Sequence, residues 1–591
     1  EGMKLIPNLI CSGTAVGGNC NSPYDIMGKI IGKVLATEKN PSTMEEFYFW
    51  TNPELVLNPF DVVKVDHINN STTYGVVEEI SHITDTANFL SDYISNDFGD
   101  VSVQPITHRI GMNYVKARIL GNTQGIYIPV LNSKSVCIAE KAEVRDALGL
   151  ANIQHPIPCG YLEMYQGASK EEQVKLRVDV DARFLIGPEG AHLNISGISG
   201  LAAKTSYAMF LLKGIQDKCL TAEDPEDDED VAFVLFNVKG RDLLAIDEPN
   251  EFTNAKEREE TLELYKYLEM SPTPFKNVHY YYPYSTKNCW NTYLDKAAVE
   301  HNISTNKACM YKYEYKMDKD NLDLMFASLD DPTQTMDAIL SYIISGRGNF
   351  GHLESWAEFL DEVHKCGEAG SSKNGQGSQE ITVQSWRKFE RIVKKSIYRN
   401  NMFDDIHDNN KETRIREALG RIKKNEVHVI DIAKLNDDMQ CFVFGDAVRA
   451  IYDLQLGQYS SDDDYTPPSK IVIFIDELNK YASSDTPKSS PILRQVLDIA
   501  ERGRSLGVVL FGAEQFKSAI HQRVTGNCST FAYGRTNSIE LSKSDYRFIP
   551  SVYKSMMSRL KQGEYIIQNP VFSSLLSVKF PKPIYKQFKS K

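Results

Sequence analysis

Short apolar strands that alternate with helix-like segments constrain this chain more than any other feature of its sequence. A strand, a crossover helix and a further strand favour a mostly parallel sheet. The sequence therefore predicts an α/β domain. Its strands are expected at His192–Ser196, Val231–Val238, Val427–Ile432, Ile471–Ile475, Val508–Gly512 and Thr530–Tyr533.

A loop of small residues follows the first of these strands. Gly197–Thr205 reads Gly-Ile-Ser-Gly-Leu-Ala-Ala-Lys-Thr and opens an apolar helix expected at Lys204–Ile215. Small residues let backbone N–H groups approach phosphate oxygens, and a helix N-terminus adds partial positive charge. The loop is one residue longer than GxxxxGK[ST], and Ala203 replaces the last glycine, so an ordinary strand-to-helix turn is the alternative. The residues predicted to bind a nucleotide are Gly197, Gly200, Ala202, Ala203, Lys204, Thr205, Ser206 and Asp476.

Two adjacent carboxylates end the apolar strand Ile471–Ile475. In a phosphate-loop protein, Lys204 would reach the β- and γ-phosphates, while the Thr205 hydroxyl and Asp476 would hold Mg²⁺. Glu477 is expected to polarise the attacking water as a general base. A buried strand that happens to end in acids is the alternative, and it loses weight because the small-residue loop accompanies it.

A polar residue ends the next predicted strand. Gln515 closes the segment Val508–Gln515, at the position where a γ-phosphate sensor is expected in such folds. A capped strand end is the other interpretation.

The first part of the chain is rich in short alternating strands. They are expected at Glu46–Thr51, Val62–His67, Tyr74–Ile80, Tyr114–Ile119 and Ile126–Pro129, with a helix at Thr84–Ser95. This spacing is typical of a small barrel or sandwich. The predicted domains are a β-barrel for assembly or partner docking at 1–170 and an ATPase domain at 171–591, with a mostly helical insertion at about 250–425.

Composition narrows the functional classes. No run approaches the ~18 apolar residues of a membrane span. The N-terminus lacks the basic and apolar stretches of a secretory signal. The protein is therefore expected to be cytoplasmic and not to associate with a membrane. Ten cysteines without CxxC spacing favour a reducing compartment. The net charge of −13 makes any DNA contact a local one.

Several blocks resemble those of HerA-type ATPases of the HerA/FtsK superfamily. Glu501–Gly507, followed by Val508–Gln515, is similar to the family's "GRKxGxGLxLxxQ" block, and Cys528–Asn537 is similar to "CNTxxxxRxTN". Phe236–Gly240 and Val578–Pro583 resemble family strands. The β-rich front end is similar to the small barrel (HAS-barrel-like) that precedes the motor in HerA proteins.

The resemblance implies a RecA-like core that works as a homo-hexameric ring, with ATP and Mg²⁺ bound between subunits. An arginine of one subunit would then neutralise transition-state charge in its neighbour's site. Arg535 is favoured for this role in trans and Arg504 as a helper, and an interface ion pair is the alternative for either.

Two functions stay open. The first is an ATP-driven translocase or helicase on double-stranded DNA that works with a partner nuclease. The second is an ATP-dependent scaffold that assembles and activates an effector, a nuclease or a Sir2-like NAD hydrolase, bound through the N-terminal barrel. Divergent relatives of the resembled family occur in bacterial antiphage defence, which both functions would suit.

Overall fold

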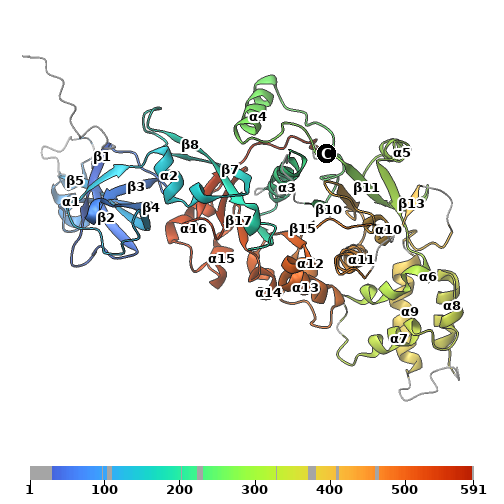
Figure 1. Cartoon of the computed structure of the whole chain (residues 1–591). Coiled ribbons are helices and arrows are strands. Elements are labelled where there is room, and N and C mark those ends of the chain that lie inside the picture. Colours follow the sequence, from blue (N-terminus) through green and yellow to red (C-terminus); the bar gives the residue numbers. More distant parts are fainter. Residues whose placement is uncertain are drawn as a thin grey trace, which may run out of the picture. The chain divides into compact units, whose positions relative to one another are not determined.

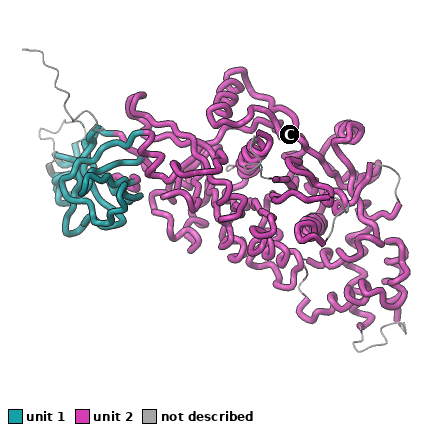
Figure 2. The backbone as a smooth tube through the Cα atoms, in the orientation of Figure 1, with its two compact units in different colours: residues 1–55, 62–75, 81–140 teal, residues 56–61, 76–80, 141–591 magenta. Residues whose placement is uncertain are grey.

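The computed structural model describes residues 29–95, 97–100, 102, 110–200, 203–221, 230–327, 329, 331–369, 381–398, 400–406, 411–458 and 465–588 (Figure 1). The chain divides into two compact units (Figure 2). One comprises residues 1–55, 62–75 and 81–140, and the other comprises residues 56–61, 76–80 and 141–591.

The first unit is built on a closed barrel with the strand order β1-β2-β5-β4-β3-β6. Along β2, the side chains of Phe47 and Phe49 are fully buried while Trp50 is exposed, which is the period-two pattern of a sheet with one covered face. The strands are β1 Ile30–Leu35, β2 Glu46–Thr51, β3 Val62–Asp66, β4 Thr72–Thr84, β5 Gly111–Asn122 and β6 Ser135–Ile138, and the helix α1 spans Phe89–Ser95.

Four of the five strands expected in this part of the sequence are present, as β2 to β5. The expected strand Ile126–Pro129 is wrong, because these residues form an irregular segment. It follows a turn at Gly125, whose φ is 67°, and Pro129 has no N–H to donate to a neighbouring strand. The expected helix is shorter than predicted and begins at Phe89.

The second unit contains a sheet that has thirteen strands among the described residues, in the order β13-β12-β11-β14-β10-β15-β16-β9-β17-β18-β19-β7-β8. The pairs from β13 through β17 are parallel, whereas β17 through β8 pair antiparallel. The strands are β7 Pro156–Met164, β8 Val174–Asp181, β9 Leu193–Ser196, β10 Val231–Asn237, β11 Val278–Pro283, β12 Ala308–Tyr311, β13 Glu412–Thr413, β14 Val427–Asp431, β15 Lys470–Asp476, β16 Val508–Glu514, β17 Thr530–Tyr533, β18 Glu564–Gln568 and β19 Leu576–Lys579.

The order β10-β15-β16-β9-β17 places one strand, β16, between the strand that leads into the small-residue loop and the strand that ends in two carboxylates. This is the arrangement of a RecA-like core. The predicted fold class, an α/β RecA-like core together with a small N-terminal β-barrel, is confirmed.

Helices connect the parallel strands. The α-helices of the second unit are α2 Lys141–Ala147, α3 Lys204–Thr221, α4 Ala255–Tyr267, α5 Lys296–Ser304, α6 Tyr315–Asp318, α7 Thr335–Ile344, α8 Trp356–Cys366, α9 Val383–Tyr398, α10 Ile415–Leu419, α11 Asp437–Gln455, α12 Asn479–Ala482, α13 Pro491–Leu506, α14 Gln522–Thr525, α15 Ser538–Leu541 and α16 Ser551–Met557. Short 3₁₀ turns lie at Ile68–Asn70, Asp97–Gly99, Leu150–Asn152, Ala182–Phe184, Lys319–Phe326, Phe350–His352, Lys517–Ala519 and Ser544–Tyr546. Within the described part of the chain, no helix combines the length and apolarity that crossing a membrane requires.

Between residues 250 and 425 the chain contains helices α4 to α10 and also the strands β11, β12 and β13, which extend the main sheet beyond β14. Helices α6 to α9 gather in one group (Figure 1). Sequence alone indicated the helices but not these strands.

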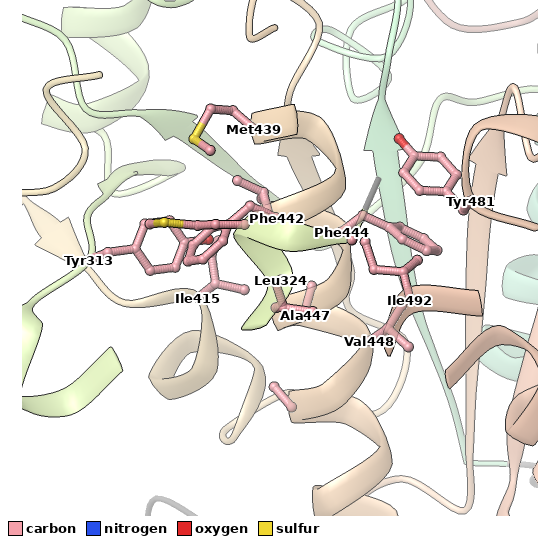
Figure 3. Close-up of a cluster of buried hydrophobic side chains, with 14 of the residues drawn as sticks. Tyr313, Leu324, Ile415, Met439, Phe442, Phe444, Ala447, Val448, Tyr481 and Ile492 are labelled. Atoms are coloured by element: carbon pink, nitrogen blue, oxygen red, sulfur yellow. The ribbon is translucent and has the colours of Figure 1, made fainter. Parts of the chain in front are cut away.

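Helix α11 packs against the segment that contains Tyr313 and Leu324 on one side and against the sheet on the other (Figure 3). The ring of its Phe442 lies 4.8 Å from the ring of Tyr313. The ring of its Phe444 lies 4.2 Å from the ring of Tyr481 in α12, the helix that follows β15. Gly445 permits a close approach, because a Cβ atom there would meet a Leu324 methyl at 2.8 Å. One buried helix therefore packs against both regions.

Candidate active site

The small-residue loop connects β9 to α3 at the carboxyl edge of the parallel sheet, where ligands of open α/β sheets bind. Among the loop residues that the structure describes, Gly200 with φ 79° and Ala203 with φ 49° have left-handed backbones. A glycine adopts this conformation without cost, whereas an alanine is strained by ~1 kcal/mol or more. Ala203 thus has a backbone conformation that favours glycine. Ala202 lies outside the described residues.

Lys204 is a buried cation without a counter-ion. Its ammonium group donates to the Gly197 carbonyl at 3.0 Å and to the Ser199 hydroxyl at 3.2 Å, and the residue is only 5% exposed. Burial lowers the pKa of Lys204, and the charge of Asp476 opposes that shift. Among the described residues, no carboxylate lies within 4.0 Å of this ammonium group. A buried ammonium group held only by neutral oxygens favours an anion as its missing partner.

The two carboxylates lie at the carboxyl end of β15, and their charges act on Lys204. Asp476 is buried at the end of β15, and one of its oxygens accepts from the Glu477 N–H at 2.8 Å. Glu477, directly after the last residue of β15, has a left-handed backbone with φ 58°. Strained backbones of this kind gather at functional sites.

Two lysines that sequence reasoning did not single out hold these carboxylates. Lys239, just after β10, lies 3.2 Å from an oxygen of Asp476 and 3.1 Å from an oxygen of Glu477. Lys480 lies 2.9 Å from the other oxygen of Glu477. Burial raises the pKa of Glu477, but the hydrogen bonds from Lys480 and Lys239 outweigh it and give a net lowering. Glu477 is therefore ionised, as a general base must be.

Removing the Lys239 charge tests this arrangement. The Lys239→Met variant is expected to lower the free energy of unfolding of the nucleotide-free protein by about 1–2 kcal/mol, since Asp476 loses its cation. This value lies below that of a fully buried pair because the Lys239 side chain is 36% exposed. Urea denaturation provides the measurement. Lys256→Met is the matched control, because its side chain is 85% exposed, and an equal effect of both variants would contradict the interpretation.

Gln515 links the strand between the two motifs to the loop. Its side-chain amide donates to the Ser199 hydroxyl at 2.9 Å, and this hydroxyl also accepts from Lys204. The preceding Glu514 is fully buried, and burial raises the pKa of this carboxyl far above its usual value. Burial thus favours the uncharged form of Glu514, which lies directly before Gln515.

Thr205 and Ser206 are the second and third residues of α3, and both are half-buried. Arg535 follows β17, and its carbonyl accepts from the Ile198 N–H of the loop at 2.8 Å. Within the described part of the chain, its half-buried guanidinium has no hydrogen-bond or ion-pair partner.

Arg504 lies apart from this group. It sits in the last turn of α13, which precedes β16, and its guanidinium donates to the Glu189 carbonyl at 3.1 Å. This position is at the amino edge of the sheet, whereas the loop follows the carboxyl ends of the strands. The described site residues thus converge at the carboxyl edge, except for Arg504.

Comparison with known proteins gives distant structural likenesses only. No protein-family model and no curated protein matches the chain. The chain is similar to the plasmid coupling protein TrwB in complex with the ATP analogue ADPNP, with 11% identity and a TM-score of 0.40 over 67% of this chain and 86% of that one. It is also similar to VirB4 of Thermoanaerobacter pseudethanolicus, with 12% identity and a TM-score of 0.38 over 73% and 96%.

A third likeness is to the genome packaging NTPase B204 of Sulfolobus turreted icosahedral virus 2 in complex with ATP-gammaS. The identity is 16% and the TM-score is 0.21, over 28% of this chain and 72% of that one. Because all three TM-scores lie below 0.5, the site assignment rests on the strand order and contacts of this chain.

Proposed function

We propose that this chain is a ring-forming ATPase of the HerA/FtsK kind that couples ATP hydrolysis to movement along double-stranded DNA, together with a partner nuclease or other effector. The observation that carries the proposal is the buried, counter-ion-free ammonium group of Lys204. It lies at the start of a helix, and the charges of Asp476 and Glu477 act on it from beyond ion-pair distance. A triphosphate supplies the negative charge that this position lacks.

The residues divide the chemistry among them. The loop backbone and Lys204 bind the phosphates, and Gln515 shares the Ser199 hydroxyl with Lys204, so it can report a change at the γ-phosphate end. Thr205 and Asp476 carry the oxygen ligands that Mg²⁺ prefers, and Mg²⁺ would neutralise charge that develops on the phosphates. A carboxylate oxygen of Glu477 accepts the proton of the attacking water.

Two arginines are proposed to act between neighbouring subunits of the ring. Arg535 has a guanidinium without a partner among the described residues, which suits a group that acts on a neighbouring subunit. Arg504 would help it in trans, because it lies at the opposite edge of its own sheet.

A second function is favoured by the state of Glu477. Both oxygens of this carboxylate are held by lysines, at 3.1 and 2.9 Å, so the base is restrained in the nucleotide-free protein. Such a restraint would slow turnover, which suits an ATP-dependent scaffold in the cytoplasm that assembles an effector, a nuclease or a Sir2-like NAD hydrolase, through the N-terminal barrel. A role in antiphage defence fits either function.

The deciding experiment measures the mass of the purified complex and its ATPase rate with and without double-stranded DNA. A mass near that of six chains and a DNA-stimulated rate are expected. Lys204→Ala is expected to weaken ATP binding by about 10- to 150-fold, because one charge-assisted contact is lost. A ring that hydrolyses ATP slowly, at a rate that DNA does not change, would support the scaffold function. A Lys204→Ala variant that binds ATP normally would refute both functions.

A further inference from the structure

A cavity of about 650 Å³ opens beside the first turn of α3. Ala203 and Ser206 line it from the side of the phosphate loop. The other walls come from one face of α4, from the turn at Gln562 and Gly563, and from the C-terminal segment 580–587. The cavity therefore continues from the point where the loop ends.

The walls of the cavity are fixed by contacts among themselves. The Phe580 ring lies 4.9 Å from the ring of Tyr207, the residue that follows Ser206. The Asn250 amide donates to the Pro583 carbonyl at 2.8 Å, and the Tyr265 hydroxyl donates to the Lys582 carbonyl at 3.2 Å. The ring contact holds the C-terminal segment against α3, and the two hydrogen bonds hold it to Asn250 and to α4. The cavity is thus formed before a ligand enters, as is usual for small-molecule sites.

The lining suits an uncharged, partly aromatic ligand. Two acids, Glu257 and Glu260, stand against two bases, Lys256 and Lys582, so the charges balance. The remaining groups are neutral and combine hydrogen-bonding amides and hydroxyls with apolar walls, which come from Asn250, Asn254, Thr261, Leu264, Gln562, Phe580, Pro581, Pro583 and Gln587. The cavity has no net positive charge to bind a phosphate chain. It does offer apolar surface and hydrogen-bond partners to a nucleobase and a ribose.

We infer that this cavity binds the nucleoside part of the nucleotide whose phosphates occupy the loop, an inference that rests on the proposed function. In a phosphate loop the lysine contacts the β- and γ-phosphates. The nucleoside is attached to the α-phosphate and therefore lies at the opposite end of the phosphate chain. Ser206, two residues beyond Lys204, lines the cavity. The C-terminal segment and α4 therefore decide which nucleosides the site accepts.

The test fills the cavity from an exposed position. Glu260 lies on the α4 face that lines the cavity, and its side chain is 63% exposed, so Glu260→Trp narrows the space without touching the core. Binding of ATP and of inorganic tripolyphosphate is measured by equilibrium dialysis. The variant is expected to weaken ATP binding at least ~10-fold and to leave tripolyphosphate binding within about twofold of the original.

Controls separate the possible failures. Glu259→Trp, on the same helix but outside the cavity lining, is expected to change neither affinity. Gln562→Trp narrows the cavity from the opposite wall, and it is expected to reproduce the selective loss if Glu260→Trp fails to fold. Unchanged ATP binding in both cavity variants, or an equal loss of tripolyphosphate binding, would overturn the inference. An unaltered protein that binds neither ligand would refute the proposed function itself.

Discussion

Glu477→Gln is expected to slow steady-state ATP hydrolysis by about 100-fold or more while ATP still binds. General-base catalysis contributes about 10²- to 10⁴-fold, and an amide cannot accept the proton of the attacking water. Glutamine keeps the size of the side chain and one oxygen that can accept from Lys239 or Lys480, which lie 3.1 and 2.9 Å from the carboxylate oxygens. The hydrolysis rate is measured by phosphate release, and ATP binding by equilibrium dialysis.

The contrast with Lys204→Ala makes this result specific. The lysine variant is expected to lose binding, whereas the glutamate variant should retain bound ATP and fail only in the chemical step. A Glu477→Gln variant that hydrolyses ATP at the original rate would remove this residue from the proposed mechanism. A variant that no longer binds ATP would instead assign it to the binding of nucleotide.

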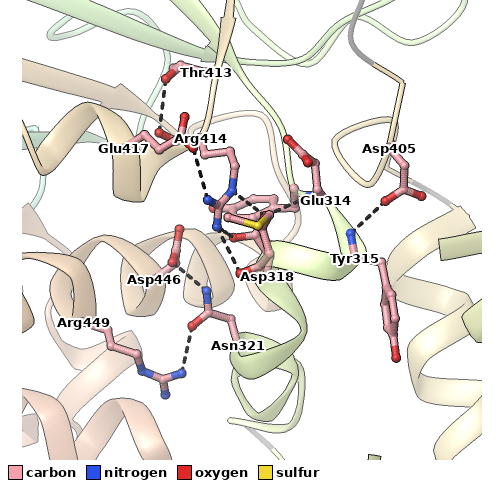
Figure 4. A network of polar contacts seen from close by, with 12 residues as sticks. Glu314, Tyr315, Asp318, Asn321, Asp405, Thr413, Arg414, Glu417, Asp446 and Arg449 are labelled. Atoms are coloured by element: carbon pink, nitrogen blue, oxygen red, sulfur yellow. Dashed lines mark hydrogen bonds and ion pairs between the residues drawn. The ribbon is translucent and has the colours of Figure 1, made fainter. Parts of the chain in front are cut away.

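Arg414→Met is expected to lower the free energy of unfolding by about 3–5 kcal/mol, because it leaves a buried carboxylate without its cation. Two guanidinium nitrogens of Arg414 donate hydrogen bonds to the carboxylate of Asp318, and both side chains are almost fully buried (Figure 4). Burial raises the pKa of Asp318, and the hydrogen bonds from Arg414 oppose this shift. Methionine retains the apolar stem of the arginine, so the loss reflects charge rather than volume.

Urea denaturation followed by tryptophan fluorescence measures this effect, since Trp356 and Trp386 are buried in the same hydrophobic cluster. Arg523→Met is the matched control, because Arg523 pairs with Glu501 at the surface and its side chain is 58% exposed. An unchanged denaturation midpoint is expected for the control. If the Arg414 variant were equally unchanged, the buried pair would have no structural role.

Much of the fold was predictable because its signals are local. Apolar strands followed by helices indicated the parallel sheet, and the order of the strands places Lys204, Asp476, Glu477 and Gln515 at one edge. Each of these residues ends a strand or begins a helix, so short sequence windows were enough to propose them. Carboxyl ends of parallel strands meet at the same edge, which brings distant windows together.

Other parts depend on pairings that no short window contains. Lys239 reaches the carboxylates only because β10 pairs with β15 in parallel register. The strands β11 to β13 lie within a stretch whose charged, helical periodicity conceals them. The cavity beside α3 is assembled from residues 203–206, 250–264 and 562–587, which only the folded chain brings together. Arg504 belongs to a block that resembles a family motif. Its position at the amino edge of the sheet could not be predicted from that block, because it depends on where α13 ends.

The extension of the main sheet by β11 bears on how this chain can be shortened. β14 has five buried residues, and its residues Val427 to Ile430 pair with Val278 to Tyr281 of β11. A chain without residues 250–425 would therefore present a normally buried strand with unpaired N–H and C=O groups along one side. Such an exposed edge recruits strands from other molecules and promotes aggregation. The segment is thus no detachable module, and its removal should cost solubility before it reveals any separate function.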